Sequence, residues 1–119
     1  MWVKVLRAKI HRARVTETHL DYEGSITIDA DLLDAAGVLP GEAVLVANVT
    51  NGTRHETYVL AGERGSGTIC LNGAAARLGE PGDVVIILAF AYLEPDELAD
   101  HRPQKILVDD RNRYVREMP

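Results

Sequence analysis

The chain has 119 residues, a length typical of one folded domain that buries a core without disulfides or metal ions. Its hydrophobic share of 46% and charged share of 26% exclude disordered and fibrous classes of protein. The formal net charge of -5, with no dense Lys/Arg block, argues against nucleic acid as a partner.

The single cysteine, Cys70, has no partner for an internal disulfide, which is compatible with a reducing compartment. Residues 1–14 carry basic side chains spread among apolar ones, and no continuous apolar stretch reaches the length of a signal peptide or a membrane span. We therefore expect a cytoplasmic protein that does not associate with a membrane.

The first part of the chain predicts a strand, a short strand and a helix. Local alternation of apolar and polar residues over 3–15 indicates a strand, and a slip in that alternation indicates a bulge. Residues 25–28 form a short β-branched run typical of a strand. Asp29 or Asp31 is placed to cap the helix that follows, and Gly37 is placed to end it.

The middle of the chain predicts a hairpin. Residues 43–49 are apolar enough for a strand that is buried on both faces. Asn51-Gly52 suits a type I′ turn, and residues 54–60 form the returning strand. Because successive side chains of a strand alternate between faces, Thr57 and Tyr58 are expected to point in opposite directions.

A glycine-rich turn at 62–67 separates the hairpin from the next strand, 68–71. This turn lacks the Gly-Lys-Ser/Thr ending of a phosphate-binding loop, so we interpret it as a flexible β-turn. A short helical stretch is expected over 74–78. The small residues at this strand-to-helix junction leave backbone N–H groups open to an anion, although composition alone indicates only a tight junction.

The last third of the chain predicts a central strand at 84–91, its most hydrophobic segment, and a weaker strand at 105–108. The charged residues 109–119 are expected to be loosely ordered or to dock on a neighbouring subunit. Short, closely spaced strands with two or three short helices indicate a small, mainly β barrel that forms a single domain over residues 1–119.

No metal site is expected from the histidines. They show neither the paired spacing nor the cysteine partners of a zinc site, and they are His11, His19, His55 and His101.

Several motifs, in order along most of the chain from about Lys4 to Tyr92, resemble the aspartate 1-decarboxylase family. They are Lys9-Ile10-His11-Arg12, Tyr22-Glu23-Gly24-Ser25, Leu33-Asp34-Ala35-Ala36-Gly37, Asn48-Val49-Thr50-Asn51-Gly52, Arg54 with Thr57-Tyr58, Glu63-Arg64-Gly65-Ser66 and Asn72-Gly73-Ala74-Ala75-Ala76. The resemblance implies a double-psi β-barrel that assembles as a homotetramer with active sites between subunits.

The resemblance also implies self-cleavage between Gly24 and Ser25 into a β chain (1–24) and an α chain (25–119). Ser25 then becomes a covalently bound pyruvoyl group, with no metal and no pyridoxal phosphate. This group forms a Schiff base with L-aspartate and releases CO₂ and β-alanine, which feeds pantothenate and coenzyme A synthesis. Whether cleavage is spontaneous or needs a maturation factor stays open at this point.

Roles for individual residues follow from the same resemblance. Thr57 donates to the Gly24 oxygen during cleavage and also contacts substrate, and Tyr58 reprotonates the carbanion. Lys9 and Arg54 suit the two carboxylates of the substrate, since Arg grips a carboxylate through parallel hydrogen bonds. The remaining pocket-lining groups are His11, Tyr22, Asn72, Gly73, Ala74 and Ala75.

One departure from the family stands at Ala47, where some members carry a tryptophan near the substrate, so the pocket wall is expected to differ. The alternative to an enzyme is a small β-barrel that binds a partner, never cleaves itself and catalyses nothing.

Overall fold

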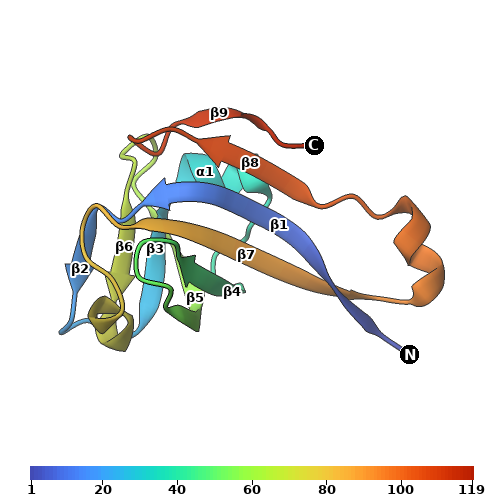
Figure 1. Cartoon of the computed structure of the whole chain (residues 1–119), viewed down its shortest axis with the longest axis horizontal. Helices are drawn as coiled ribbons and strands as arrows, with labels where there is room; N and C mark the ends of the chain where they lie inside the picture. The colour runs from blue at the N-terminus through green and yellow to red at the C-terminus, as the bar shows by residue number, and fades with distance from the viewer.

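The computed structural model describes residues 1–119, and it contains nine strands, one α-helix and two 3-10 helices (Figure 1). In chain order these are β1 (Val3–Arg14), β2 (Glu17–His19), β3 (Ser25–Asp29), α1 (Ala30–Ala36), β4 (Ala43–Asn48), β5 (Arg54–Gly62), β6 (Ile69–Asn72), η1 (Gly73–Arg77), β7 (Val84–Leu93), η2 (Pro95–Asp100), β8 (Gln104–Val108) and β9 (Tyr114–Glu117). The mainly β fold expected from the sequence is confirmed.

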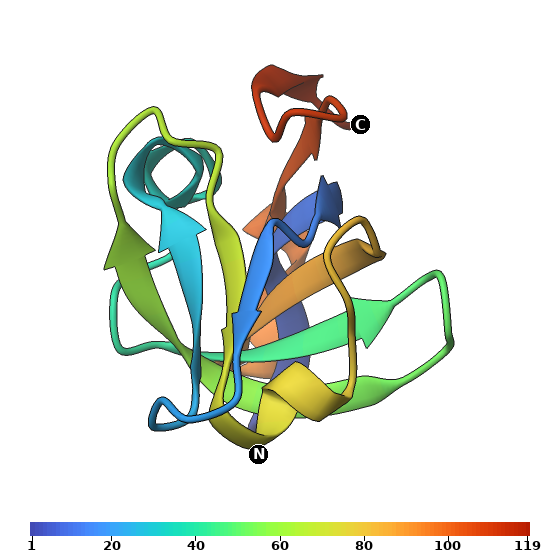
Figure 2. The ribbon, with the colours of Figure 1, turned by 90° about the vertical axis from the view of Figure 1, so that its left-hand side faces the viewer.

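All nine strands belong to one mixed sheet with the order β2-β6-β3-β5-β4-β7-β1-β8-β9. Three strand pairs are parallel, namely β1 with β8, β2 with β6 and β3 with β5. Viewed from its end, the sheet curls strongly, with α1 above and η1 below (Figure 2). The expected central strand is β7, which pairs with β1 on one side and β4 on the other.

The core inside the curled sheet is entirely aliphatic. Its 21 buried residues are Ala, Val, Ile and Leu, and among the largest fully buried ones are Ile10, Ile26 and Ile87. A sequence with few aromatic residues has to fill its interior with such side chains, and β-branched ones fit the concave face of a curved sheet.

The long strand β1 contains the bulge expected from its broken alternation. Its register against β7 shifts between Leu6 and Ala8 and again between Ile10 and Ala13. Arg12, within the second shift, has a φ of 66°, which is left-handed and rare for a residue with a side chain. The bulge lets Ile10 and Ala13 both remain buried.

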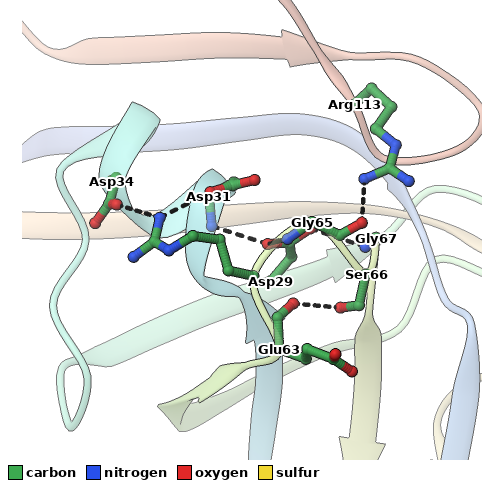
Figure 3. Close-up of polar contacts among 9 residues, drawn as sticks. Asp29, Asp31, Asp34, Glu63, Gly65, Ser66, Gly67 and Arg113 are labelled. Carbon is green, nitrogen blue, oxygen red and sulfur yellow. Dashed lines mark hydrogen bonds and ion pairs between the residues drawn. The ribbon is translucent and has the colours of Figure 1, made fainter.

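Of the two residues expected to cap helix α1, Asp29 and Asp31, the structure shows Asp29 at the cap. The Asp29 carboxylate accepts from Asp31 N at 2.8 Å, and Gly37 ends the helix in the left-handed conformation with a φ of 72°. The same carboxylate accepts from the backbone N–H groups of Gly65 and Gly67 at 3.0 and 2.8 Å (Figure 3). These three donors hold the pKa of Asp29 below its usual range, although burial acts in the opposite direction.

The glycine-rich turn therefore binds a carboxylate of its own chain. Arg64 bridges from it to Asp31 and Asp34 at 2.7 and 2.6 Å, and Arg113 donates to the Gly65 carbonyl (Figure 3). The prediction of a turn in place of a phosphate loop fits this arrangement.

Two expectations about the hairpin were wrong in detail. Strand β4 is buried on one face only, because Leu45 and Ala47 on its other face stay partly exposed on the single chain. The turn after β4 is not type I′, which needs two residues with positive φ. Only Gly52 has one, and the Asn48 side chain caps the loop by accepting from Thr50 N and Asn51 N.

The C-terminal residues are ordered on their own chain. Strand β9 pairs with β8, and Asn112 is buried where it donates to the carbonyls of Arg14 and Gly67. The expectation of a loosely ordered tail missed this because β9 is exposed and charged. None of the helices is long and apolar enough to cross a membrane.

Candidate active site

Ser25 is fully buried, and its backbone is strained. It is the first residue of β3 and has a φ of 140°, outside the range that residues with a Cβ adopt readily. Such conformations cost on the order of 1–3 kcal/mol and persist only where the surroundings enforce them. A buried, strained serine directly after a glycine is the most unusual backbone feature of the chain.

The hydroxyl of Ser25 is held by the amide of Asn72. Asn72 Nδ2 donates to Ser25 Oγ at 2.9 Å and to Thr27 Oγ1 at 3.0 Å, while Asn72 Oδ1 accepts from Cys70 Sγ at 3.2 Å. The antiparallel register, in which Ser25 faces Asn72 and Thr27 faces Cys70, places all four side chains on one face of the sheet. The Asn72 amide is therefore fixed at both ends.

Gly73 allows the loop before Ser25 to pack against the start of η1. Its φ is 66°, and a Cβ built on it would lie 2.8 Å from both the Cα and N of Gly24 and 2.9 Å from the Tyr22 carbonyl oxygen. No side chain fits in that space, so a glycine is required for this close approach. Gly24 itself has open space where a Cβ would lie.

An open pocket of about 450 Å³ adjoins this junction. It brings together five of the residues singled out from the sequence, Gly24, Thr57, Asn72, Ala74 and Ala75. His55, Glu56 and Leu78 complete its lining.

Thr57 and Tyr58 lie on opposite faces of β5, as the alternation predicted. Thr57 lines the pocket beside Gly24. Tyr58 is 41% exposed, and the parallel register of β3 with β5 puts it beside Ser25, on the face of the sheet opposite to that of Thr57. The two side chains therefore flank the Gly24–Ser25 junction from two sides.

Lys9 and Arg54 lie away from the pocket, on the face of the sheet that carries Tyr58. The pairing of Lys9 with Leu88, Leu88 with Leu45, and Leu45 with Glu56 connects β1 to β5 across two intervening strands. Neighbouring strands lie about 4.8 Å apart. Measured along the sheet, the Lys9 backbone is therefore about 14 Å (three spacings) from β5 and about 19 Å (four spacings) from β3. Neither cation takes part in any of the chain's ion pairs.

Ala47, where some members of the family carry a tryptophan, pairs directly with Arg54 across the β4–β5 hairpin. A small residue here leaves one side of Arg54 open.

Tyr22 and His11, the other two residues expected to line the site, lie at different distances from Ser25. Tyr22 precedes the junction, is 61% exposed and stacks on His19 with ring centroids 4.6 Å apart. His11 lies on β1 opposite Leu107 of β8, away from Ser25. Burial, with the nearby charges of Lys9 and Arg12, lowers the pKa of His11 and favours its neutral form.

His55 lines the pocket and was not singled out from the sequence. Its Nε2 is buried without a hydrogen-bond partner, and burial lowers the pKa of its imidazole. The signal that would have found it is the strand alternation, because residues 55 and 57 share the face of β5 that reaches the pocket.

The chemistry available at the junction is intramolecular. A serine hydroxyl held by an amide, a preceding glycine with free space around it, and a threonine hydroxyl on the glycine side suit attack by Ser25 Oγ on the neighbouring carbonyl carbon.

Comparison with known proteins gives a consistent result. The family model described as aspartate decarboxylase matches residues 1–115. The aspartate 1-decarboxylase of Caldicellulosiruptor saccharolyticus is 58% identical over 116 residues, which cover 98% of this chain and 91% of the relative. The aspartate 1-decarboxylases of Staphylococcus carnosus and Salinibacter ruber are each 59% identical, over 93% and 94% of this chain and 87% and 77% of their own lengths.

Proposed function

Because the chain belongs to the aspartate decarboxylase family and is an aspartate 1-decarboxylase, we propose that it acts through a pyruvoyl group made from its own Ser25. As a carboxy-lyase of this family it converts L-aspartate to β-alanine and CO₂, which supplies pantothenate synthesis. The alternative of a barrel without catalytic activity is wrong, because relatives of this identity over nearly the whole chain are decarboxylases.

Cleavage begins with attack of Ser25 Oγ on the Gly24 carbonyl carbon. The Ser25 nitrogen leaves, and an ester joins the two residues. Negative charge develops on the Gly24 oxygen, and the Thr57 hydroxyl lines the pocket on that side. Asn72 orients the attacking hydroxyl through its 2.9 Å hydrogen bond. Release of the backbone strain at Ser25 favours the same direction.

Elimination then breaks the ester. A base removes the Cα proton of residue 25, the Gly24 carboxylate departs, and the dehydroalanine that is left hydrolyses to a ketone with loss of ammonia. The products are a β chain of residues 1–24 and an α chain of residues 25–119, which together keep the fold of one domain. The unpartnered, neutral imidazole of His55 in the same pocket suits the role of base.

The residues around position 25 fit a pyruvoyl group. The Asn72 amide that holds Ser25 Oγ offers a donor to a carbonyl oxygen, and Gly24 and Gly73 leave room beside it. Once formed, a pyruvoyl group would supply the electron sink for decarboxylation of a bound amino acid.

Substrate recognition is assigned to the two free cations. Arg54 binds one carboxylate of L-aspartate through paired hydrogen bonds, and Lys9 attracts the other as a compact charge. Tyr58, next to Ser25 on the same face of the sheet, delivers a proton to the substrate Cα after CO₂ leaves. Ala74 and Ala75, together with Thr57, line the pocket beside Gly24.

The site is completed between chains in this proposal. Four strand spacings, about 19 Å along the curled sheet, separate Lys9 from β3, so we assign Lys9 to the site of a second chain. The face that carries Lys9 also exposes apolar side chains, among them Leu45, Phe90 and Tyr92. Burying such a face against a second copy suits the homotetramer and the double-psi β-barrel implied by the resemblance.

The observation that carries the proposal is the strained, buried Ser25 bonded to Asn72. Mass spectrometry of the purified protein is expected to show two fragments separated at Gly24–Ser25, the larger without a free amino terminus. Ser25→Ala should leave a single 13.0 kDa chain that makes no β-alanine. Ser66→Ala, in the exposed turn, is the matched control and should cleave normally.

An intact wild-type chain after prolonged incubation, combined with no β-alanine, would contradict the proposal. Cleavage that starts only when cell extract is added would instead show that a maturation factor is needed.

A further inference from the structure

A second group of reactive side chains lies beside Ser25, on the edge of the sheet. Strands β2 and β6 lie side by side in Figure 1. In their parallel register Glu17 faces Cys70 and His19 faces Asn72, so these side chains share one face. A carboxylate oxygen of Glu17, a ring nitrogen of His19 and Sγ of Cys70 all lie within 4.8 Å of one another. The proposed decarboxylation uses none of them.

These three groups are ligands that Zn²⁺ prefers. Tetrahedral zinc with sulfur and nitrogen ligands holds its ligand atoms roughly 3.5 Å apart. His19 Nε2 and Glu17 Oε2 are already 2.9 Å apart, so binding requires Cys70 Sγ to approach by about 1 Å. Strand β2 has only three residues at the sheet edge, and the His19 and Glu17 side chains are 39% and 50% exposed, so they are free to adjust.

The group is coupled to Ser25 by two hydrogen bonds. Cys70 Sγ donates to Asn72 Oδ1 at 3.2 Å, and Asn72 Nδ2 donates to Ser25 Oγ at 2.9 Å. As the donor in this hydrogen bond, the Cys70 thiol carries a proton. A cation at this position would offset the Glu17 charge.

We propose that Glu17, His19 and Cys70 bind a thiophilic divalent cation such as Zn²⁺, and that the bound ion slows cleavage at Ser25. Coordination by the Cys70 thiolate releases the thiol proton to solvent, which removes the donor to Asn72 Oδ1 and loosens the amide that orients Ser25. The second half rests on the proposed function; the binding of the ion does not. The sequence indicated no metal site because only the pairing of β2 with β6 brings His19 to Cys70.

Titration with Co²⁺ tests the site through its absorption spectrum. We expect a thiolate-to-cobalt charge-transfer band that saturates at one ion per chain. Cys70→Ser, which keeps a donor for Asn72, should abolish the band. His19→Ala and Glu17→Gln, at exposed positions that leave folding intact, should each weaken binding at least about tenfold.

The matched control is His101→Ala. His101 contacts the Leu6 carbonyl near η2, far from β2, so binding should be unchanged in this variant. Absence of the band in the wild-type protein, or wild-type affinity in both His19→Ala and Glu17→Gln, would overturn the site.

The coupling is measured on freshly purified, uncleaved full-length chain, with Zn²⁺ or with chelator. Loss of one hydrogen bond should slow cleavage about 2- to 10-fold in Zn²⁺, and the His19→Ala chain should not respond. Equal rates with Zn²⁺ and chelator, or equal slowing in His19→Ala, would overturn the coupling. If neither chain cleaves in chelator, even after cell extract is added, the proposed function fails while the Co²⁺ titration still decides the site.

Discussion

The junction around Ser25 and the charged face that carries Lys9 and Arg54 are built on opposite principles. At the junction, Ser25, Asn72 and Cys70 are buried and joined in one hydrogen-bond network. On the charged face, neither cation has an ion-pair partner, and three strand spacings, about 14 Å, separate the backbones of β1 and β5.

The difference indicates that a single chain already holds the groups for self-cleavage in place, whereas the groups for substrate binding still lack partners. A satisfied, rigid network holds a nucleophile and its target in place before anything binds, which suits a reaction of the chain with itself. Unpaired cations gain partners only when an anion arrives, which suits recognition of a substrate dianion. Variants of the two regions should therefore separate cleavage from decarboxylation.

Tyr58→Phe should give the largest separation. Loss of the hydroxyl removes the proposed proton donor and should lower kcat by about 10²- to 10⁴-fold, while cleavage continues. β-Alanine production under saturating L-aspartate measures the first effect, and fragment masses measure the second. Tyr114→Phe, an exposed tyrosine on β9, is the matched control; a fully active Tyr58→Phe enzyme would remove Tyr58 from the chemistry.

Thr57→Val should have the converse effect. The isosteric change deletes the proposed donor to the Gly24 oxygen and should slow cleavage about 10²- to 10³-fold, as measured by the half-life of the intact chain. Thr57→Ser keeps the hydroxyl and should restore most of the rate. If the valine and serine variants cleave equally fast, the hydroxyl has no part in the step.

Gly73→Ala should give the smallest effect, and it should lower both the stability of the fold and the rate of cleavage. The added Cβ would lie 2.8 Å from Gly24 in a backbone with positive φ, so we expect a loss of about 1–3 kcal/mol, seen as a lower Tm, and slower cleavage. Gly41→Ala, with a φ of 85° and open space around it, carries only the backbone strain. Equal effects on cleavage in both variants would show that contact with Gly24 is unimportant.

The sequence predicted the long elements well because each carries its own local signal. The broken alternation of β1, the apolar run of β7 and the caps at Asp29 and Gly37 need only neighbouring residues. Strand β2 and strand β9 were missed because they are short and polar, and each is stabilised by pairing with another strand, β6 for β2 and the preceding β8 for β9.

The residues of the site likewise fall into those that sequence motifs predict and those that only strand pairing brings together. The order of motifs identified Gly24, Ser25, Thr57 and Asn72, and the structure brings these residues together. The approach of His19 to Cys70 depends on the parallel register of β2 with β6, and no local pattern predicts a contact between such remote segments. The partial exposure of Leu45 was likewise not predictable from the sequence. An apolar run has the same residue pattern whether its second face packs on the core or on another chain.

The claim that one chain performs cleavage while two chains complete the decarboxylation site is tested most directly by complementation. Ser25→Ala, which cannot cleave, and Lys9→Ala, which is expected to cleave but lacks the cation that a second chain supplies, are coexpressed with different tags and purified through both. Each variant alone should be inactive. Mixed oligomers should recover up to about a quarter of wild-type activity, because random assembly pairs the two intact surfaces at that fraction of interfaces. Mixed oligomers as inactive as their parents would contradict the account.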